Sequence, residues 1–182
     1  MNSSRVLTFN GPYTEDKYNQ FFNPNVCHVC KQPSEVLVTC NLCYMISFCS
    51  EEHRAIHRNS HSEICKTLAM IITDISLWVR YDSLGEWIES RKRILQHILL
   101  TLSRFASQHE SEMIMFAKSC CVCFRQANIW PCKICYSVNF CDDHQIAFRQ
   151  LHEMCCKDLL LLLNTNIMCL TGCMEQLMSL ER

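Results

Sequence analysis

The sequence predicts small metal-stabilised α+β fingers combined with α-helices. Three observations lead to this fold class. Cysteine is unusually frequent, with 16 residues against only 3 glycines in 182 residues. The cysteines and histidines fall into two segments with the same order and nearly the same spacing. The remaining segments carry apolar residues at helical spacing. We therefore expect two cross-braced double-metal modules, joined by a helical hairpin-like segment and followed by a C-terminal helix.

The composition favours metal ligands over disulfide bonds. The first 22 residues have no apolar core flanked by basic residues, so no secretory signal is predicted. No run approaches the roughly 18 apolar residues of a membrane span, and no membrane association is expected. We expect an intracellular protein, nuclear or cytoplasmic. Cysteines in such reducing compartments are more often metal ligands or reactive thiols than disulfides.

Residues 1–26 form the first expected unit. They read as a polar, mobile lead-in to the first finger. Aromatic residues interrupt it, and four of them offer apolar surface either to the finger or to a partner. The sequence leaves both alternatives open for Tyr13, Tyr18, Phe21 and Phe22.

Two segments, 27–65 and 120–156, repeat the same pattern of six cysteines and two histidines. The first contains Cys27, Cys30, Cys40, Cys43, Cys49, His53, His61 and Cys65. The second contains Cys120, Cys123, Cys132, Cys135, Cys141, His144, His152 and Cys156. Every corresponding gap agrees to within one residue. Eight such ligands suit two tetrahedral zinc sites, so we expect two zinc ions per segment and four per chain.

The spacing favours an interleaved assignment within each segment. A C-x2-C pair suits one metal because a tight turn brings both thiolates to the same side. The expected sets are Cys27, Cys30, Cys49 and His53; Cys40, Cys43, His61 and Cys65; Cys120, Cys123, Cys141 and His144; and Cys132, Cys135, His152 and Cys156. Each set is a closed Cys3His site, which is typical of structural rather than catalytic zinc.

Five further residues compete with this assignment or stand beside it. His57 lies four residues from both His53 and His61, so it is an alternative to either. Cys121 and Cys155 adjoin expected ligands, but only Cys120 and Cys156 preserve the repeat. The remaining two of the five are Cys169 and Cys173. They are one helical turn apart on an apolar face, where we expect core packing.

These motifs resemble those of MYND-type zinc fingers. The matching runs are CHVC, CNLC, FCSEEH and HSEIC in the first segment, and CCVC, CKIC, FCDDH and HEMCC in the second. The resemblance implies a protein-interaction module. That family usually has cysteine where His53 and His144 stand. Members that bind proline-rich peptides usually carry a tryptophan where this chain has Arg58 and Arg149, which argues against that ligand.

Residues 66–119 form the expected helical connector. Ser83 and Glu86 fit a capping box at the start of a helix over 84–106. Apolar residues follow at helical spacing: Ile88, Leu95, Ile98, Leu102 and Phe105. An earlier helix is expected over about 62–80, with Ser60 and Glu63 as a second capping box.

Residues 157–182 are expected to form an amphipathic C-terminal helix. Its apolar stripe steps by three and four residues through Leu160, Leu163, Ile167, Leu170, Met174 and Leu177. Our main interpretation packs this stripe on the 84–106 helix of the same chain. The alternative is a homodimer, or a groove for a partner's helix.

These features favour a zinc-dependent, non-enzymatic protein-interaction adaptor. The expected partners are proteins, including short linear peptides. By analogy, the resemblance suggests a transcriptional or chromatin regulatory complex. Nucleic-acid binding is the first alternative, but the formal net charge is −1 and no basic stripe is present. The second alternative is a methyltransferase-related chain without its catalytic domain. We find neither a catalytic residue set nor an organic cofactor-binding loop.

Overall fold

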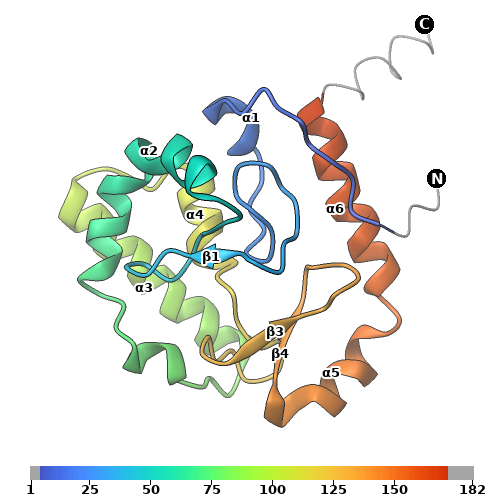
Figure 1. Cartoon of the computed structure of the whole chain (residues 1–182). Helices are drawn as coiled ribbons and strands as arrows, with labels where there is room; N and C mark the ends of the chain where they lie inside the picture. The colour runs from blue at the N-terminus through green and yellow to red at the C-terminus, as the bar shows by residue number, and fades with distance from the viewer. Residues whose placement is uncertain (1–4, 172–182) are drawn as a thin grey trace, which may run out of the picture.

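The computed structural model describes residues 5–171 (Figure 1). Its helices are α1 (Glu15–Tyr18), α2 (Glu51–Ala69), α3 (Leu84–Leu102), α4 (Gln108–Met115), α5 (Gln145–His152) and α6 (Cys156–Thr171), with 3-10 turns η1 (Ile75–Trp78) and η2 (Asp142–His144). Its strands are β1 (Val38–Thr39), β2 (Ser47–Phe48), β3 (Ile129–Pro131) and β4 (Asn139–Cys141). The expected fold class of small sheets, double-metal modules and helices is confirmed.

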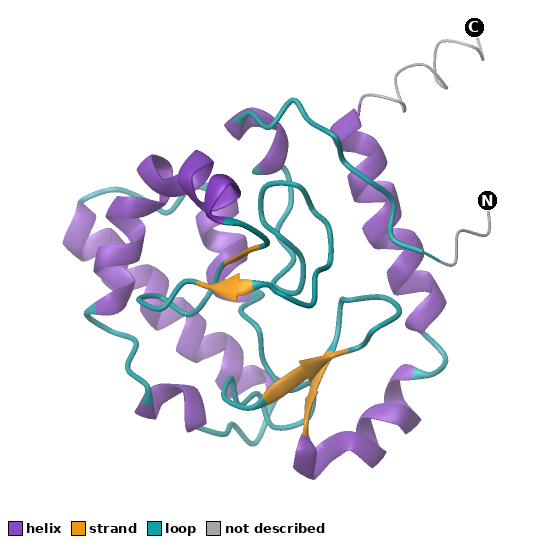
Figure 2. Ribbon diagram, in the orientation of Figure 1, coloured by secondary structure: helices purple, strands orange, loops and turns teal. Residues whose placement is uncertain are grey.

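Each finger contains one two-stranded antiparallel sheet followed by a helix. Strand β1 pairs with β2, with Val38 opposite Phe48. Strand β3 pairs with β4, with Trp130 opposite Phe140. Figure 2 shows these short sheets set among long loops, so the hydrogen bonds of the sheets hold little of either finger in place.

The N-terminal segment is packed, and the expectation of a mobile lead-in is wrong for the described residues. Phe9 and Tyr18 are 1% and 0% exposed within the main core, which also contains buried residues of the first finger. The ring of Tyr13 lies 5.0 Å from that of His53 in an edge-on arrangement. The segment therefore adds the apolar surface that a small finger lacks.

The first connector helix begins and ends earlier than expected. Helix α2 starts at Glu51, and the Ser50 hydroxyl caps it by accepting a hydrogen bond from the His53 N–H. Ser60 lies inside this helix, where its hydroxyl donates to the carbonyl of His57 instead of capping. Residues 75–78 form only a 3-10 turn. The expected helix over 62–80 therefore merges two separate elements.

The second connector helix starts where the sequence places it. The Ser83 hydroxyl accepts a hydrogen bond from the Glu86 N–H. The Glu86 carboxylate accepts from the N–H of Asp82 rather than from that of Ser83, so only half of the expected capping box forms. Helix α3 ends at Leu102, because Ser103 adopts a left-handed conformation with φ 53°.

Helix α6 packs against the N-terminal segment rather than along α3. Figure 1 shows residues at the start of the chain running beside it. The Asn164 side chain accepts from the N–H of Leu7 at 2.8 Å and donates to the carbonyl of Arg5 at 3.0 Å. A cavity of about 700 Å³, lined by residues of both helices, lies where direct α3–α6 packing was expected.

The predicted apolar stripe of α6 is buried as far as the structure describes it. Its described members are Leu160, Leu163, Ile167 and Leu170. Cys169 is exposed, so the expectation that it packs in the core is wrong. Three other predictions lie outside the described residues: Cys173, Met174 and Leu177.

No single helix within residues 5–171 is long and apolar enough to cross a membrane. By length and composition alone, the pair Asp142–His152 and Cys156–Thr171 passes the test, but it is bent by 87°.

The connector makes direct contacts with the second finger. The Tyr81 N–H donates to the carbonyl of Cys123 at 3.0 Å, and the Ala127 N–H donates to that of Leu77 at 2.9 Å. The fingers also meet each other, because Lys133 pairs with Glu35 at 3.0 Å. Both fingers are therefore held in one arrangement.

Candidate metal centres

The structure brings the sixteen candidate ligands together in four separate sets. They are Cys27, Cys30, Cys49 and His53; Cys40, Cys43, His61 and Cys65; Cys120, Cys123, Cys141 and His144; and Cys132, Cys135, His152 and Cys156. Within each set all ligand atoms lie within 4.8 Å of one another. The two sets of a finger alternate along the chain, which is the cross-braced arrangement expected from the spacing.

A tight turn builds each C-x2-C pair. The residue after the second cysteine donates its N–H to the carbonyl of the first, at 2.8 to 3.0 Å in all four turns. That residue has a positive φ in each case: Lys31, Tyr44, Phe124 and Tyr136. Glycine is the usual residue for this left-handed conformation. The side chain at this position makes the turn strained, but the turn places both thiols of the pair on the same side.

The distances within the sets fit a tetrahedral zinc ion. Zn–S bonds of about 2.3 Å and Zn–N bonds of about 2.0 Å imply edges of about 3.8 Å between sulfurs and about 3.5 Å from sulfur to nitrogen. Cys40 Sγ lies 3.5 Å from Cys65 Sγ, and Cys43 Sγ lies 3.4 Å from His61 Nε2. The corresponding distances in the second finger are 3.7 and 3.4 Å. The chain accordingly binds four zinc ions, each in a closed Cys3His set.

The two histidines of a finger use different ring nitrogens. His53 Nδ1 lies 3.1 Å from Cys49 Sγ, and His144 Nδ1 lies 3.2 Å from Cys141 Sγ. His61 and His152 instead present Nε2. The first histidine follows its cysteine neighbour closely in the chain, so the near nitrogen suffices. The second histidine lies further along a helix from its metal set, so it uses Nε2, the nitrogen further from the backbone.

In each set one thiol has a lowered pKa, whereas at least one other resists ionisation unless a cation lies beside it. Burial raises the pKa of Cys135 to about 12. Burial, together with a hydrogen bond to Cys120, raises the pKa of Cys141 to about 11. A zinc ion compensates for the buried negative charge and converts these thiols into thiolate ligands. The donor sets therefore fit zinc both in geometry and in charge.

His57 is placed outside the metal sets. Its Nδ1 lies 3.3 Å from the Tyr18 hydroxyl and 3.1 Å from that of Ser60. Its ring lies 4.5 Å from that of His28, a buried residue that sequence reasoning missed. Burial lowers the pKa of His57 to about 3 and also lowers that of His28. The two imidazoles are therefore neutral core residues. No spacing signal marks His28, because it lies inside a C-x2-C pair.

Two further cysteines also lie outside the sets. Burial raises the pKa of Cys121 to about 11, the opposite of what a nucleophilic thiol requires. Cys155 Sγ lies 3.7 Å from Nδ1 of His152, whose Nε2 already faces the metal set. The imidazole beside Cys155 is thus committed to metal binding.

The first finger also carries a small groove beside α2, with a volume of about 170 Å³. Leu42 and Phe48 supply apolar surface to it. Arg54, Arg58 and Lys66 supply cations. Arg58, at the position that the resemblance associates with tryptophan, thus lines a groove on the surface of the finger.

Comparison with known families agrees with this geometry. The MYND finger model matches residues 27–65. No curated protein and no solved structure matches the chain. The segment 120–156 repeats the ligand order, the four-residue turns and the closed Cys3His sets of the matched segment. The chain therefore carries tandem MYND-like zinc fingers.

Proposed function

We propose that this protein is a zinc-dependent adaptor that holds other proteins through its fingers. MYND fingers are zinc-binding protein–protein interaction domains. The groove beside α2 carries the proposal, because Leu42 is 52% exposed at its edge without a covering element. An exposed apolar side chain at the mouth of a groove is typical of an interaction site.

The charge at this groove favours a particular kind of peptide. Arg54, Arg58 and Lys66 surround the apolar surface. Arg54 is partly neutralised by Glu51 at 3.2 Å, whereas Arg58 is exposed. A short linear peptide with an apolar anchor and flanking acidic residues would match both features.

The arrangement of the fingers supports an adaptor rather than an isolated module. Contacts from the connector and between the fingers fix their separation. Two fixed surfaces gain avidity when one partner or complex engages both. We further propose a non-enzymatic role, since each metal set offers four protein ligands and thus no open position for a substrate or water.

The cellular setting is the finer part of the proposal. We infer an intracellular location, because cysteine-rich zinc sites persist where thiols stay reduced. A transcriptional or chromatin regulatory complex is the setting that the family resemblance suggests.

Surface variants that spare the zinc ligands test this function. The full chain, Leu42→Asp and Arg58→Glu would each be used to capture partners from nuclease-treated native lysate. Leu100→Asp is the matched control, because Leu100 is 73% exposed on α3, away from the groove. We expect the two groove variants to lose a common set of proteins that Leu100→Asp retains.

Native mass spectrometry of the same samples would establish that all variants keep four zinc ions. Capture that survives both groove variants would contradict a role for the groove in binding. Capture that occurs in untreated lysate and disappears after nuclease treatment would favour nucleic-acid binding instead.

A further inference from the structure

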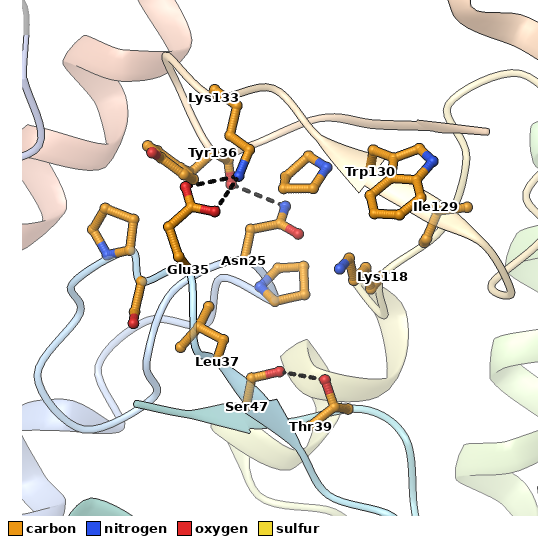
Figure 3. Close-up of a pocket in the computed structure, with 14 residues that line it drawn as sticks. Asn25, Glu35, Leu37, Thr39, Ser47, Lys118, Ile129, Trp130, Lys133 and Tyr136 are labelled. Carbon is orange, nitrogen blue, oxygen red and sulfur yellow. Dashed lines mark hydrogen bonds and ion pairs between the residues drawn. The ribbon is translucent and has the colours of Figure 1, made fainter. Parts of the chain in front are cut away.

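A second cavity lies between the two fingers and belongs to neither alone. Its volume is about 400 Å³. The first finger contributes Glu35 and Leu37, and the second contributes Trp130 and Lys133. Asn25 and Lys118, each just before a finger, also line it (Figure 3). We call this cavity the inter-finger cleft.

Asn25 presents an unused hydrogen-bond acceptor in the inter-finger cleft. The residue is 3% exposed. Its side-chain nitrogen donates to the carbonyl of Tyr136 at 3.0 Å, which fixes the orientation of the amide. Its Oδ1 has no partner among residues 5–171. Buried polar atoms are nearly always paired, so this oxygen indicates a missing donor.

Lys118 presents an unused cation in the same cleft. It is partly buried, and within the described part of the chain no hydrogen bond or ion pair is found for its ammonium group. The other lysine is neutralised, because Lys133 Nζ lies 3.0 and 3.2 Å from the two carboxylate oxygens of Glu35. Figure 3 shows the Lys118 ammonium directed into the cleft, with the Lys133–Glu35 pair on another wall. The cleft therefore has an excess of positive charge.

Trp130 offers the cleft an aromatic surface. It is 54% exposed. Its indole N–H donates to the Asp142 carboxylate at 3.0 Å, so the polar edge of the ring is already satisfied. Figure 3 shows that nitrogen turned away from Asn25 and Lys118. Leu37 adds apolar surface from the first finger.

We propose that the inter-finger cleft binds an extended peptide segment through an acidic side chain. The peptide carboxylate pairs with Lys118, and a peptide N–H donates to Asn25 Oδ1. A neighbouring apolar side chain packs against Trp130. This proposal deepens the adaptor function and rests on it, but it assigns a site distinct from the groove beside α2.

The two unused groups together favour a peptide over a simple anion. A phosphate or free carboxylate satisfies the Lys118 ammonium but brings no N–H for Asn25. A peptide supplies both groups within a few ångströms of each other. A volume of about 400 Å³ lies in the range of small ligand sites and accommodates a segment of about two or three residues.

Binding of blocked peptides to the zinc-loaded full chain tests the site. The probe is a fluorescently labelled pool of N-acetylated, C-amidated hexapeptides with glutamate at one fixed position and mixed neighbours. A matched pool carries glutamine there. We expect the glutamate pool to bind at least tenfold more tightly, with an affinity that falls as salt rises.

Three charge variants locate the binding. Lys118→Gln should weaken binding of the glutamate pool about tenfold. Glu35→Gln should strengthen it several-fold, because it releases Lys133 from its ion pair. Lys92→Gln on α3 is the charge-matched control. Lys92 pairs with Glu89 and does not line the cleft, so this variant should leave binding unchanged. Partial unfolding would weaken binding in both Lys118→Gln and Glu35→Gln, so opposite responses of these two variants would not be explained by it.

Equal binding of the two pools, or an unchanged affinity in Lys118→Gln, would overturn the proposal. A third pool, with glutamine and a free C-terminal carboxylate, separates the two sources of negative charge. Tight binding of that pool alone would overturn recognition of an acidic side chain. The two proposals can fail independently of each other. Leu42→Asp tests the groove beside α2 and should leave peptide binding in the inter-finger cleft intact.

Discussion

At the scale of single residues, the two histidines of each finger differ in which nitrogen they offer. His53 and His144 present Nδ1, the nitrogen close to the backbone, and His61 and His152 present Nε2. A cysteine sulfur reaches about as far from the backbone as Nδ1 does, but it falls short of Nε2. The choice of nitrogen therefore determines which histidines a cysteine can replace.

We predict that His53→Cys and His144→Cys each keep four zinc ions, because thiolate is an equally good ligand at that distance. His61→Cys and His152→Cys should each lose one ion. Native mass spectrometry gives the stoichiometry, and the absorption of the cobalt-substituted protein reports the sulfur count. Loss of zinc from all four variants alike would contradict the geometric argument.

The buried imidazoles couple stability to pH. Burial lowers the pKa of His57 to about 3, against about 6.5 in an unfolded chain. Between these values the unfolded chain binds a proton that the folded chain excludes. Stability should therefore fall as pH decreases below about 6.5, by up to about 1.4 kcal/mol per pH unit from this residue.

Urea unfolding between pH 7.5 and 5.5, with excess zinc, measures this effect. His57→Gln removes the titrating group, so its free energy of unfolding should depend less on pH than that of the natural chain. Zinc stoichiometry must be followed in parallel, because acid also protonates ligand thiolates. Identical pH slopes for the two proteins would show that His57 is not responsible.

At the scale of elements, helix α6 is positioned by a polar residue within its apolar stripe. Asn164 is 5% exposed and makes two hydrogen bonds to the backbone of residues 5–7. Its neighbours Leu163 and Ile167 are buried in the main core. The apolar residues thus supply the burial of α6, and Asn164 specifies which segment lies beside it.

We predict that Asn164→Leu keeps α6 folded but loosens the N-terminal segment. Two hydrogen bonds, each contributing about 1 kcal/mol, are lost. Hydrogen exchange at the Leu7 amide should accelerate on the order of tenfold. Thr165→Val is a suitable control, because the Thr165 hydroxyl bonds only within α6, to the carbonyl of Leu161. An equal acceleration in both variants would indicate general loosening of the helix.

At the scale of the whole molecule, the metal ions substitute for a large core. Each strand is only two or three residues long, and many of the buried residues are the metal ligands themselves. Structural zinc contributes roughly 10–16 kcal/mol of apparent binding free energy per site. That exceeds the marginal stability of an ordinary domain.

We predict that a zinc chelator unfolds both fingers, with loss of α2 and α5 from the far-UV circular dichroism signal. Cys43→Ser and Cys135→Ser should act in the same direction, each first on its own finger. A calcium-selective chelator serves as the control. An unchanged spectrum and melting temperature in excess zinc chelator would contradict a structural role for the metal.

The local features of this protein follow from its sequence, and the packing between them does not. The repeat placed the candidate ligands in four sets, because tight turns and helical spacing depend on near neighbours in the chain. The same reasoning located the cap of α3 at Ser83. It failed for the start of α2, because Ser50 and Ser60 both precede plausible helical runs and the cap forms at Ser50.

The tertiary structure decided which residues meet across long separations in the chain. It excluded His57 from the metal sets by burying it against Tyr18 and His28. It turned α6 toward the N-terminal segment and joined the fingers around the inter-finger cleft. Such contacts depend on the shapes of surfaces far apart in the chain, and hydrophobic spacing reports only that a face is buried, not which partner covers it.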